Sequence, residues 1–204
     1  MRSLRLVTDA TAEPVTVDDL KIHLRLDTTY TTEDEYLSGL IKMARKEAEN
    51  RTRRALLPQT WKLILDDFED DMVLNVSPLS ASTEDIAITY LDETSGESTA
   101  LASTYFRIDA DSEPGRIRLE YESEWPSVYP VKGAVQVSFV AGYPITSVDP
   151  VTDTCPEAIE QWIKMRAAGL YEMRESHTER PVQEQARSFI DGLLDPYVVM
   201  EVDP

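Results

Sequence analysis

The chain has 204 residues, of which 42% are hydrophobic and 28% are charged, and its formal net charge is −18. This length is enough for one hydrophobic core, with or without a smaller satellite domain. The negative charge argues against a broad nucleic-acid interface, which requires a basic surface to displace counterions from phosphates. We see no apolar run of the roughly 18 residues that span a membrane and no secretory signal. The single cysteine, Cys155, excludes an intramolecular disulfide and fits a reducing cytosol.

A short helix is expected within residues 14–27, "PVTVDDLKIHLRLD". Thr16 and Asp19 have the spacing of a capping box, which closes the first turn of a helix. Lys21 and Arg25 fall on the side away from its apolar stripe. A helix of about ten residues is marginal in water by itself, so we expect it to pack on other helices.

A longer helix is expected at residues 33–53, where apolar residues recur at helical intervals. Thr32 and Glu35 repeat the capping-box spacing at its start. Positive charge is concentrated at its end, and the docking patch that this suggests consists of Arg51, Arg53 and Arg54. Cations also suit the negative end of a helix dipole, which explains the same residues by helix stability alone. The sequence leaves both interpretations open.

At Gln59 the period of apolar residues changes from 3.6 to 2. The stretch "TWKLILDDF" alternates apolar and polar side chains, and "DIAITYLD", "TYFRID", "GRIRLEY" and "AVQVSFVAGY" follow with the same alternation. Turn-rich pieces separate these runs. Several short strands in residues 59–143 indicate a mostly antiparallel sheet or a small barrel.

Helical period returns after residue 144, with Pro156 in the first turn of a helix and Thr154 as its cap. A shorter helix is expected from about Val182 to Leu193. The bundle core is expected to contain Leu40, Ile41, Ala44, Trp162, Ile163 and Leu170.

The predicted fold is therefore α+β, a helical bundle made from both chain ends with an inserted, mostly antiparallel β unit. We expect the N-terminal helices in residues 1–58, the β unit in 59–143, the C-terminal helices in 144–194 and an extended tail in 195–204.

The tail is unusually apolar for a chain end. Pro196 and Pro204 disfavour a helix, and the β-branched residues favour an extended segment that binds by strand addition or in a groove. The residues available for such binding are Tyr197, Val198, Val199, Met200 and Val202. Packing of the tail on its own bundle remains the alternative.

No catalytic or cofactor-binding pattern is present. The seven glycines are scattered singly, which excludes a P-loop, and only two histidines, His23 and His177, are available. The stretch "DADSEPG" has the alternating acids of a calcium loop, but Pro114 takes the place of the glycine that the loop requires. We expect no catalytic residue, no cofactor and no metal site, and keep a metal-dependent enzyme as a distant alternative.

Five segments together resemble one known family. They are "PVTVDDLKIHLRLD", "EDEYLSGLIKMARKEAENRTRRALLPQTWKLILDDF", "YFRIDADSEPGRIRL", "WPSVYPVKGAVQVSFVAGY" and "CPEAIEQWIKMRAAGLYEMRE". In order and spacing they are similar to the gp6-like or gp8-like head–tail connector (adaptor) proteins of phages, over roughly residues 14–194. The most specific pieces are the helix-to-strand junction "RALLPQTW", the segment "WPS…AVQVSFVAGY" and the helix start "PEAIEQ".

The resemblance implies a structural protein rather than an enzyme. Members form a ring, typically of twelve copies, at the head–tail interface of a virion or phage-like particle assembled in the host cytoplasm. The ring lies under the portal protein, extends the DNA channel and offers a docking surface to stopper or tail-completion proteins. In that setting we expect an acidic channel wall that passes DNA without binding it, and a tail that anchors to the portal or to a neighbouring copy. A stopper or tail-completion protein of the same neck is the nearest alternative.

Overall fold

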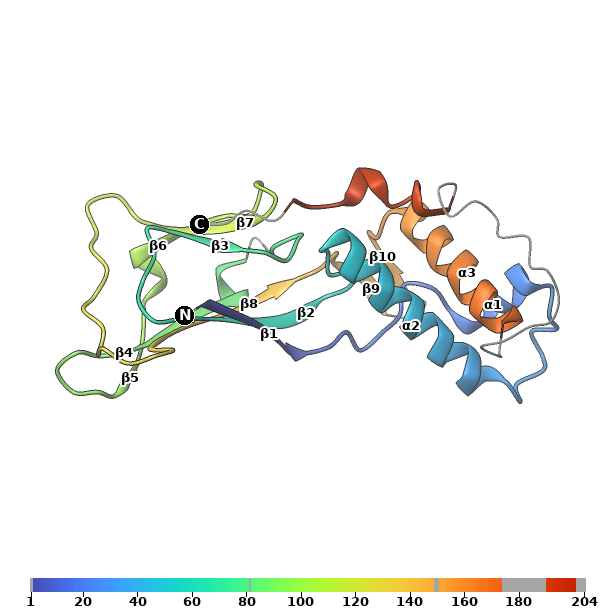
Figure 1. Ribbon diagram of the computed structural model, residues 1–204, viewed down its shortest axis with the longest axis horizontal. Helices are drawn as coiled ribbons and strands as arrows, with labels where there is room; N and C mark the ends of the chain where they lie inside the picture. The colour runs from blue at the N-terminus through green and yellow to red at the C-terminus, as the bar shows by residue number, and fades with distance from the viewer. Residues whose placement is uncertain (1, 81, 149–150, 174–189, 201–204) are drawn as a thin grey trace. The chain divides into compact units, whose positions relative to one another are not determined.

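The computed structural model describes residues 2–80, 82–148, 151–173 and 190–200 (Figure 1). The chain forms two compact units. The β unit consists of Met1–Ala10, Pro58–Tyr143 and Val199–Pro204, and the helical unit consists of Thr11–Leu57 and Pro144–Val198. The fold is α+β, which confirms the predicted class.

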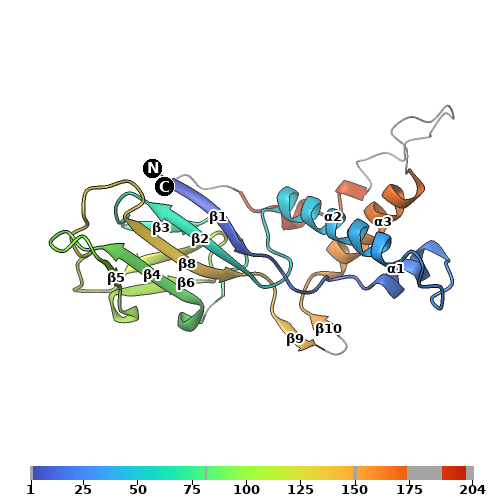
Figure 2. The ribbon, with the colours of Figure 1, turned by 90° about the horizontal axis from the view of Figure 1, so that it is seen from below.

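The β unit is built from two antiparallel sheets that form separate layers (Figures 1 and 2). The five-stranded sheet has the order β1 (Arg2–Thr8), β2 (Gln59–Leu65), β8 (Val135–Ala141), β4 (Ile86–Leu91) and β5 (Ser98–Ala100). The three-stranded sheet has the order β3 (Asp71–Leu74), β7 (Gly115–Leu119) and β6 (Phe106–Asp109). Two short 3-10 turns, η1 (Thr83–Asp85) and η2 (Ser103–Tyr105), precede β4 and β6.

Strand β8 shows why the sequence pattern predicted this unit. Successive side chains of a strand point to opposite faces, so every second residue of a half-buried strand is apolar. The side chains that β8 buries are those of Val135, Val137, Phe139 and Ala141. Strand β8 lies between β2 and β4, and its buried side chains form the inner face of the five-stranded sheet.

The first ten residues differ from the expected division, which placed residues 1–58 with the helices. Strand β1 pairs antiparallel with β2, from Arg2 opposite Leu65 to Thr8 opposite Thr60, and forms one edge of the larger sheet. Edge strands are covered on fewer sides than central strands, and Val7 of β1 is 57% exposed. The alternation of apolar residues in such a strand is therefore weak, and the sequence did not reveal it.

The helical unit contains α1 (Val17–Leu24), α2 (Asp34–Thr52) and α3 (Glu157–Glu172), and a hairpin of β9 (Ile145–Val148) and β10 (Val151–Asp153). A 3-10 turn, η3 (Asp195–Tyr197), follows near the C-terminus. Most of the helix expected at residues 182–193 lies outside the described residues, as does His177; within the described part, residues 190 and 191 are helical.

The short helix α1 is held at both ends. Its capping box is confirmed, because the Asp19 amide donates to the Thr16 hydroxyl at 3.1 Å and the Thr16 amide donates to the Asp19 carboxylate at 3.3 Å. Lys21, which was expected on the solvent side, is only 2% exposed. Its ammonium lies 2.6 Å from the carboxylate of Asp34 and donates to the carbonyl of Thr28 at 3.2 Å. This buried ion pair connects α1 to the start of α2, which supplies the partner that a helix of this length needs.

The predicted caps of α2 and α3 were wrong. The residue before α2 is Glu33, which makes no side-chain cap; its carboxylate instead accepts a hydrogen bond from the Tyr171 hydroxyl of α3 at 2.7 Å. At α3, Pro156 is itself the cap residue, because its extended backbone (ψ 129°) places it outside the helix, and Thr154 is exposed. The N-terminus of α2 thus has no side-chain cap, although the spacing of Thr32 and Glu35 predicted one.

Helices α2 and α3 pack against each other through the apolar faces that the helical period predicted. The buried residues of this contact are Leu40, Ile41, Ala44, Ala48, Ile159, Trp162, Ile163 and Ala167. Leu170, also expected in the core, is only partly buried, because α3 ends two residues later at Glu172.

Replacing Trp162 by alanine tests this core. The Trp162 side chain is 1% exposed, and removing a buried aromatic side chain should lower the free energy of unfolding by about 3–5 kcal/mol. Chemical unfolding of the full chain measures the change. Ile22→Ala in α1 is the matched control, because Ile22 is 65% exposed and its truncation should change stability by less than about 0.5 kcal/mol. Equal stabilities of the two variants would contradict the packing described here.

Candidate docking sites at the end of α2 and in the C-terminal segment

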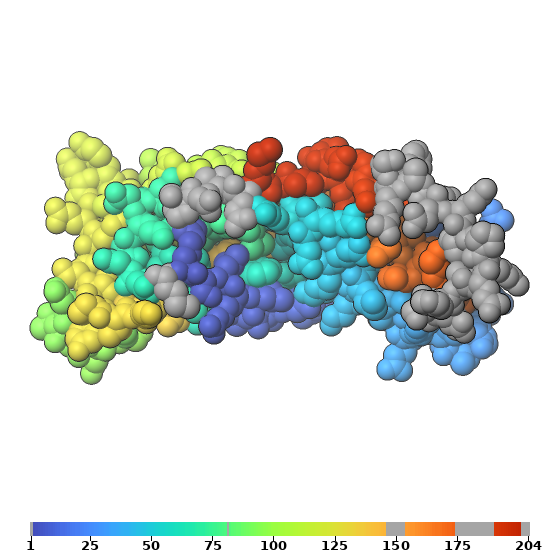
Figure 3. All heavy atoms as spheres, in the orientation of Figure 1, coloured from blue at the N-terminus to red at the C-terminus, as the bar shows by residue number. Residues whose placement is uncertain are grey.

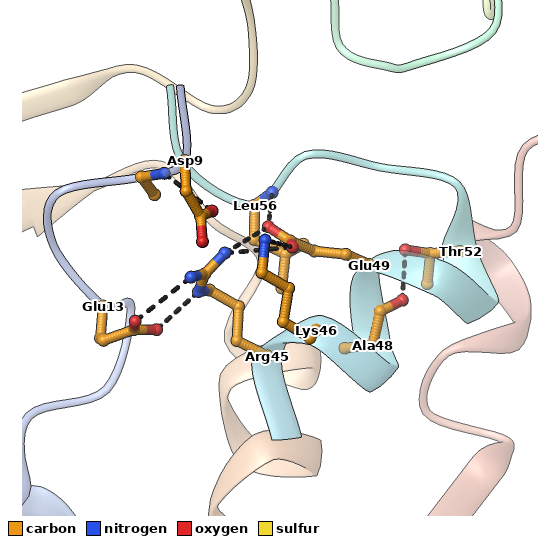
Figure 4. Close-up of polar contacts among 9 residues, drawn as sticks. Asp9, Glu13, Arg45, Lys46, Ala48, Glu49, Thr52 and Leu56 are labelled. Atoms are coloured by element: carbon orange, nitrogen blue, oxygen red, sulfur yellow. Dashed lines mark hydrogen bonds and ion pairs between the residues drawn. The ribbon is translucent and has the colours of Figure 1, made fainter. Parts of the chain in front are cut away.

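A buried arginine organises the second half of α2 (Figure 4). Arg45 is 0% exposed, and its guanidinium donates at 2.6 Å to the carboxylate of Glu13 and at 3.0 Å to that of Glu49, one turn further along α2. A buried guanidinium is tolerated only when its hydrogen-bonding capacity and charge are matched by partners. Arg45 therefore joins α2 to the segment that enters α1.

The same cluster fixes the backbone that leaves α2. The carboxylate of Glu49 accepts a hydrogen bond from the amide of Leu56 at 3.3 Å, and Leu56 and Leu57 are completely buried. Arg53 takes the left-handed conformation (φ 55°) that ends the helix and is exposed. The three arginines of the predicted docking patch thus lie at the end of α2 and on the turn that follows it, next to this buried cluster.

Arg51 lies among acidic and aromatic groups of its own unit. Its guanidinium lies 2.7 Å from the carboxylate of Asp191, 2.9 Å from that of Glu47 and 5.4 Å from the ring centre of Trp162. The hydrogen bond from Arg51 lowers the pKa of Asp191, and the same contact raises the pKa of Arg51. Arg51 thus connects the end of α2 to residues just before the tail.

Arg54 contacts the tail itself. Its side chain is largely buried, and its Nε donates to the backbone carbonyl of Tyr197 at 2.7 Å. The structure therefore brings together Arg51 and Arg54 of the predicted patch and the beginning of the predicted tail, and Figure 3 shows the two segments side by side, α2 in cyan and the C-terminal segment in red. Arg53, like Arg51, is exposed.

The C-terminal segment is held at some residues and exposed at others. Leu194 is 2% exposed and Val199 is 6% exposed, whereas Val198 is 48% exposed and Met200 is 83% exposed. The backbone of Val198 is extended (φ −69°, ψ 118°), so neighbouring side chains point in opposite directions. Of the five tail residues singled out from the sequence, Val198 and Met200 are open to a partner, Tyr197 is half-buried, Val199 is buried, and Val202 lies outside the described residues.

Sequence reasoning did not find the groups that hold this segment. Asp191 and Arg51 are far apart in the chain, and nothing in the stretch around Asp191 marks it as a partner for an arginine. Arg45 and Glu49 have the i, i+4 spacing of a surface pair, so their burial could not be predicted from this spacing. Only the packed structure shows which cations of α2 are internal.

Among the described residues we find neither a cluster of metal ligands nor a helix that could span a membrane. Within residues 2–80, 82–148, 151–173 and 190–200, no three His, Cys, Asp or Glu side chains gather as metal ligands would. Among the helices of the same residues, none is long and apolar enough to cross a membrane.

The ion pair between Arg51 and Asp191 gives a pH-dependent prediction. The folded pKa of Asp191 is lowered, so its contribution to stability is present above the unfolded value of about 3.9 and is lost as the pH falls through the folded pKa. Asp191→Asn should lower the free energy of unfolding by up to about 1 kcal/mol at pH 7, since exposed ion pairs are screened by solvent. When unfolding by urea is measured at several pH values, the difference in free energy of unfolding between Asp191→Asn and the unchanged chain should become smaller towards pH 3. A difference that is constant between pH 7 and pH 3 would contradict the pairing.

Comparison with known sequences finds a similarity to one family over part of the chain. Residues 14–105 match the family described as phage gp6-like head-tail connector protein. The matched segment begins before α1 and runs through α2 into the β unit, so it includes Arg45, Arg51 and Arg54. No curated protein sequence matches the chain.

Solved structures share the fold over almost the whole chain. A chain in the neck of an empty gene transfer agent (GTA) particle, computed with C6 symmetry, is 24% identical, with a TM-score of 0.73 over 98% of this chain and 97% of that one. Chains in the virion of a native GTA particle and in the neck of a native GTA particle with C12 symmetry are also 24% identical over the same shares, with TM-scores of 0.72 and 0.70. The likeness establishes the fold. Residues 14–105, a little under half of the chain, are similar to the phage gp6-like head–tail connector family.

Proposed function

We propose that this protein is a structural head–tail connector (adaptor) in the neck of a tailed phage or phage-like particle. Copies of the chain form a ring under the portal, extend the DNA channel and present a docking surface to stopper or tail proteins. The observation that carries this proposal is the family match over residues 14–105. The fold shared with chains of GTA necks over 98% of the sequence is consistent with it.

The ring is proposed from the family and from the symmetry of the similar particles. The related neck structures were computed with C6 and C12 symmetry, which describes rings in those particles. A ring of twelve copies of this chain fits both symmetries, since twelve is a multiple of six. The role is mechanical and involves no catalysis, in keeping with a family of structural connectors.

The charge of the chain suits a DNA channel. With a net charge of −18, the chain as a whole repels phosphates, and a conduit that holds DNA tightly would block its passage. DNA therefore passes through the ring without specific binding. The potential in the channel sums over all copies in the ring.

Attachment to the portal is assigned to the exposed side chains of the C-terminal segment. Leu194 and the bond from Arg54 to the Tyr197 carbonyl hold the start of the segment on its own chain, while Val198 and Met200 face outward. An extended, partly ordered segment with apolar side chains on one side fits a groove or a strand edge of a partner. Because part of the segment is already ordered, less conformational entropy is lost on binding.

The double substitution Val198→Ser and Met200→Ser tests this role. Both side chains are exposed, so the variant should fold with unchanged stability but bind purified portal rings at least about tenfold more weakly, a loss of about 1.4 kcal/mol. Binding is measured by co-sedimentation with portal rings. The control is Ile22→Ser with Met173→Ser, which removes two similarly exposed side chains elsewhere in the helical unit. Full portal binding by the tail variant would show that these residues are not the anchor.

A further inference from the structure

Identical copies of a chain with a net charge of −18 repel one another when they assemble. Residues 59–143 contain sixteen acidic and five basic residues, a net charge of −11. Residues 42–54 have the opposite balance, with six basic and two acidic residues. Arg45 and Arg54 are buried, so the basic side chains that reach the surface are those of Lys42, Lys46, Arg51 and Arg53. Contacts between copies are repulsive unless a basic surface of one copy meets an acidic surface of the next. The chain carries one candidate of each kind.

The basic candidate is the face of α2 opposite the bundle core, which we call the α2 trough. It is a shallow groove of about 610 Å³ that lies along the helix between Gly39 and Arg51. Met43 is 58% exposed in its floor, and at Gly39 an added Cβ would meet no atom within 4 Å. Lys42 and Lys46 line the same groove and combine aliphatic stems with charged ends; the Lys46 ammonium also lies 3.6 Å from the Glu49 carboxylate. Glu47, the acidic residue of the lining, is paired with Arg51 and Arg166. The α2 trough therefore fits a partner that is both apolar and acidic.

The acidic candidate is the loop after β7, residues 120–124, which we call the Tyr121 loop. Its sequence is "EYESE", and Tyr121 is 84% exposed, more than any other aromatic side chain among the exposed ones of the described chain. The amide of Glu120 donates to the carbonyl of Tyr105 at 2.9 Å, and the amide of Ser123 donates to the carbonyl of Glu120 at 3.1 Å. Glu122 takes the left-handed conformation (φ 60°). The loop thus presents an aromatic ring among three carboxylates on a backbone with fixed hydrogen bonds.

We infer that the Tyr121 loop of one copy docks into the α2 trough of the next copy. The Tyr121 ring packs on the polarizable side chain of Met43, a favourable type of contact. Glu122 and Glu124 pair with Lys42 and Lys46 at the rim. Since both surfaces belong to one chain and differ from each other, the contact is head-to-tail, the type that closes into a ring by rotation. This inference rests on the proposed ring and specifies the surfaces that join its subunits.

Cross-linking of isotope-mixed protein tests the contact directly. Equal amounts of ¹⁴N- and ¹⁵N-labelled full-length chain are mixed at high concentration and treated with a carbodiimide, which joins amines to carboxylates that are in contact. Mass spectrometry should find peptides that link Lys42 or Lys46 of one label to residues 120–124 of the other. Intermolecular links that exclude this pair of surfaces, or an absence of mixed-label links, would overturn the inference.

Removing the Tyr121 ring distinguishes docking through aromatic packing from attraction between opposite charges alone. Tyr121→Ala leaves every cross-linking group in place and should lower the yield of the mixed-label peptides about fivefold, because the packing on Met43 is lost. Tyr129→Ala is the matched control, because Tyr129 is another exposed tyrosine of the β unit, 44% accessible to solvent. This substitution should leave the yield of the mixed-label peptides unchanged. Equal yields from both variants would contradict the assigned role of Tyr121.

The outcome is separable from that of the proposed function. If the chain binds portal rings but the cross-links join other surfaces, the connector role stands and the subunit contact is wrong. If the chain neither binds portal rings nor forms mixed-label links, both proposals fail.

Discussion

The helical unit depends on a buried arginine that two carboxylates neutralise. Arg45 has no exposure to solvent, and its contacts with Glu13 and Glu49 join the segment before α1 to the second half of α2. Loss of one partner of such a buried pair typically costs about 3–5 kcal/mol, because the remaining charge stays in a low-dielectric interior. Through Glu49 the same cluster holds the amide of Leu56, and so sets where the chain leaves α2. The positions of Arg51, Arg53 and Arg54 follow from this arrangement.

The contacts of these arginines bear on how the basic end of α2 is interpreted. Helix-dipole stabilisation and a docking patch were the two interpretations open from sequence. In the structure, Arg51 and Arg54 contact Asp191 and the Tyr197 carbonyl of their own chain. The basic end thus orders the C-terminal segment and leaves Val198 and Met200 exposed. The proposed anchor is thereby partly preorganised before it meets a partner, which lowers the entropic cost of assembly.

The features that sequence predicted well are those that local patterns determine. The capping box at Thr16, the helical period of α2 and α3, and the change to strand period at Gln59 each depend on neighbouring residues. Features that depend on distant partners were missed. Lys21 was expected on the solvent side and is buried in an ion pair, and Arg45, which the sequence did not single out, is buried between two carboxylates. Thr32 was expected to cap a helix whose preceding residue instead contacts Tyr171. The edge strand β1 escaped notice because an exposed edge needs little alternation. For the candidate site, sequence indicated the arginines and the apolar tail but not that they would meet.

The connector role is the central claim, and electron cryo-microscopy of the neck of a particle that contains this chain tests it most directly. We expect a closed ring of copies of this chain directly beneath the portal, with a continuous channel through its centre and the C-terminal segments in contact with the portal. A map in which this fold occupies the tail tube or a position away from the portal, or in which the chain forms no ring, would contradict the account.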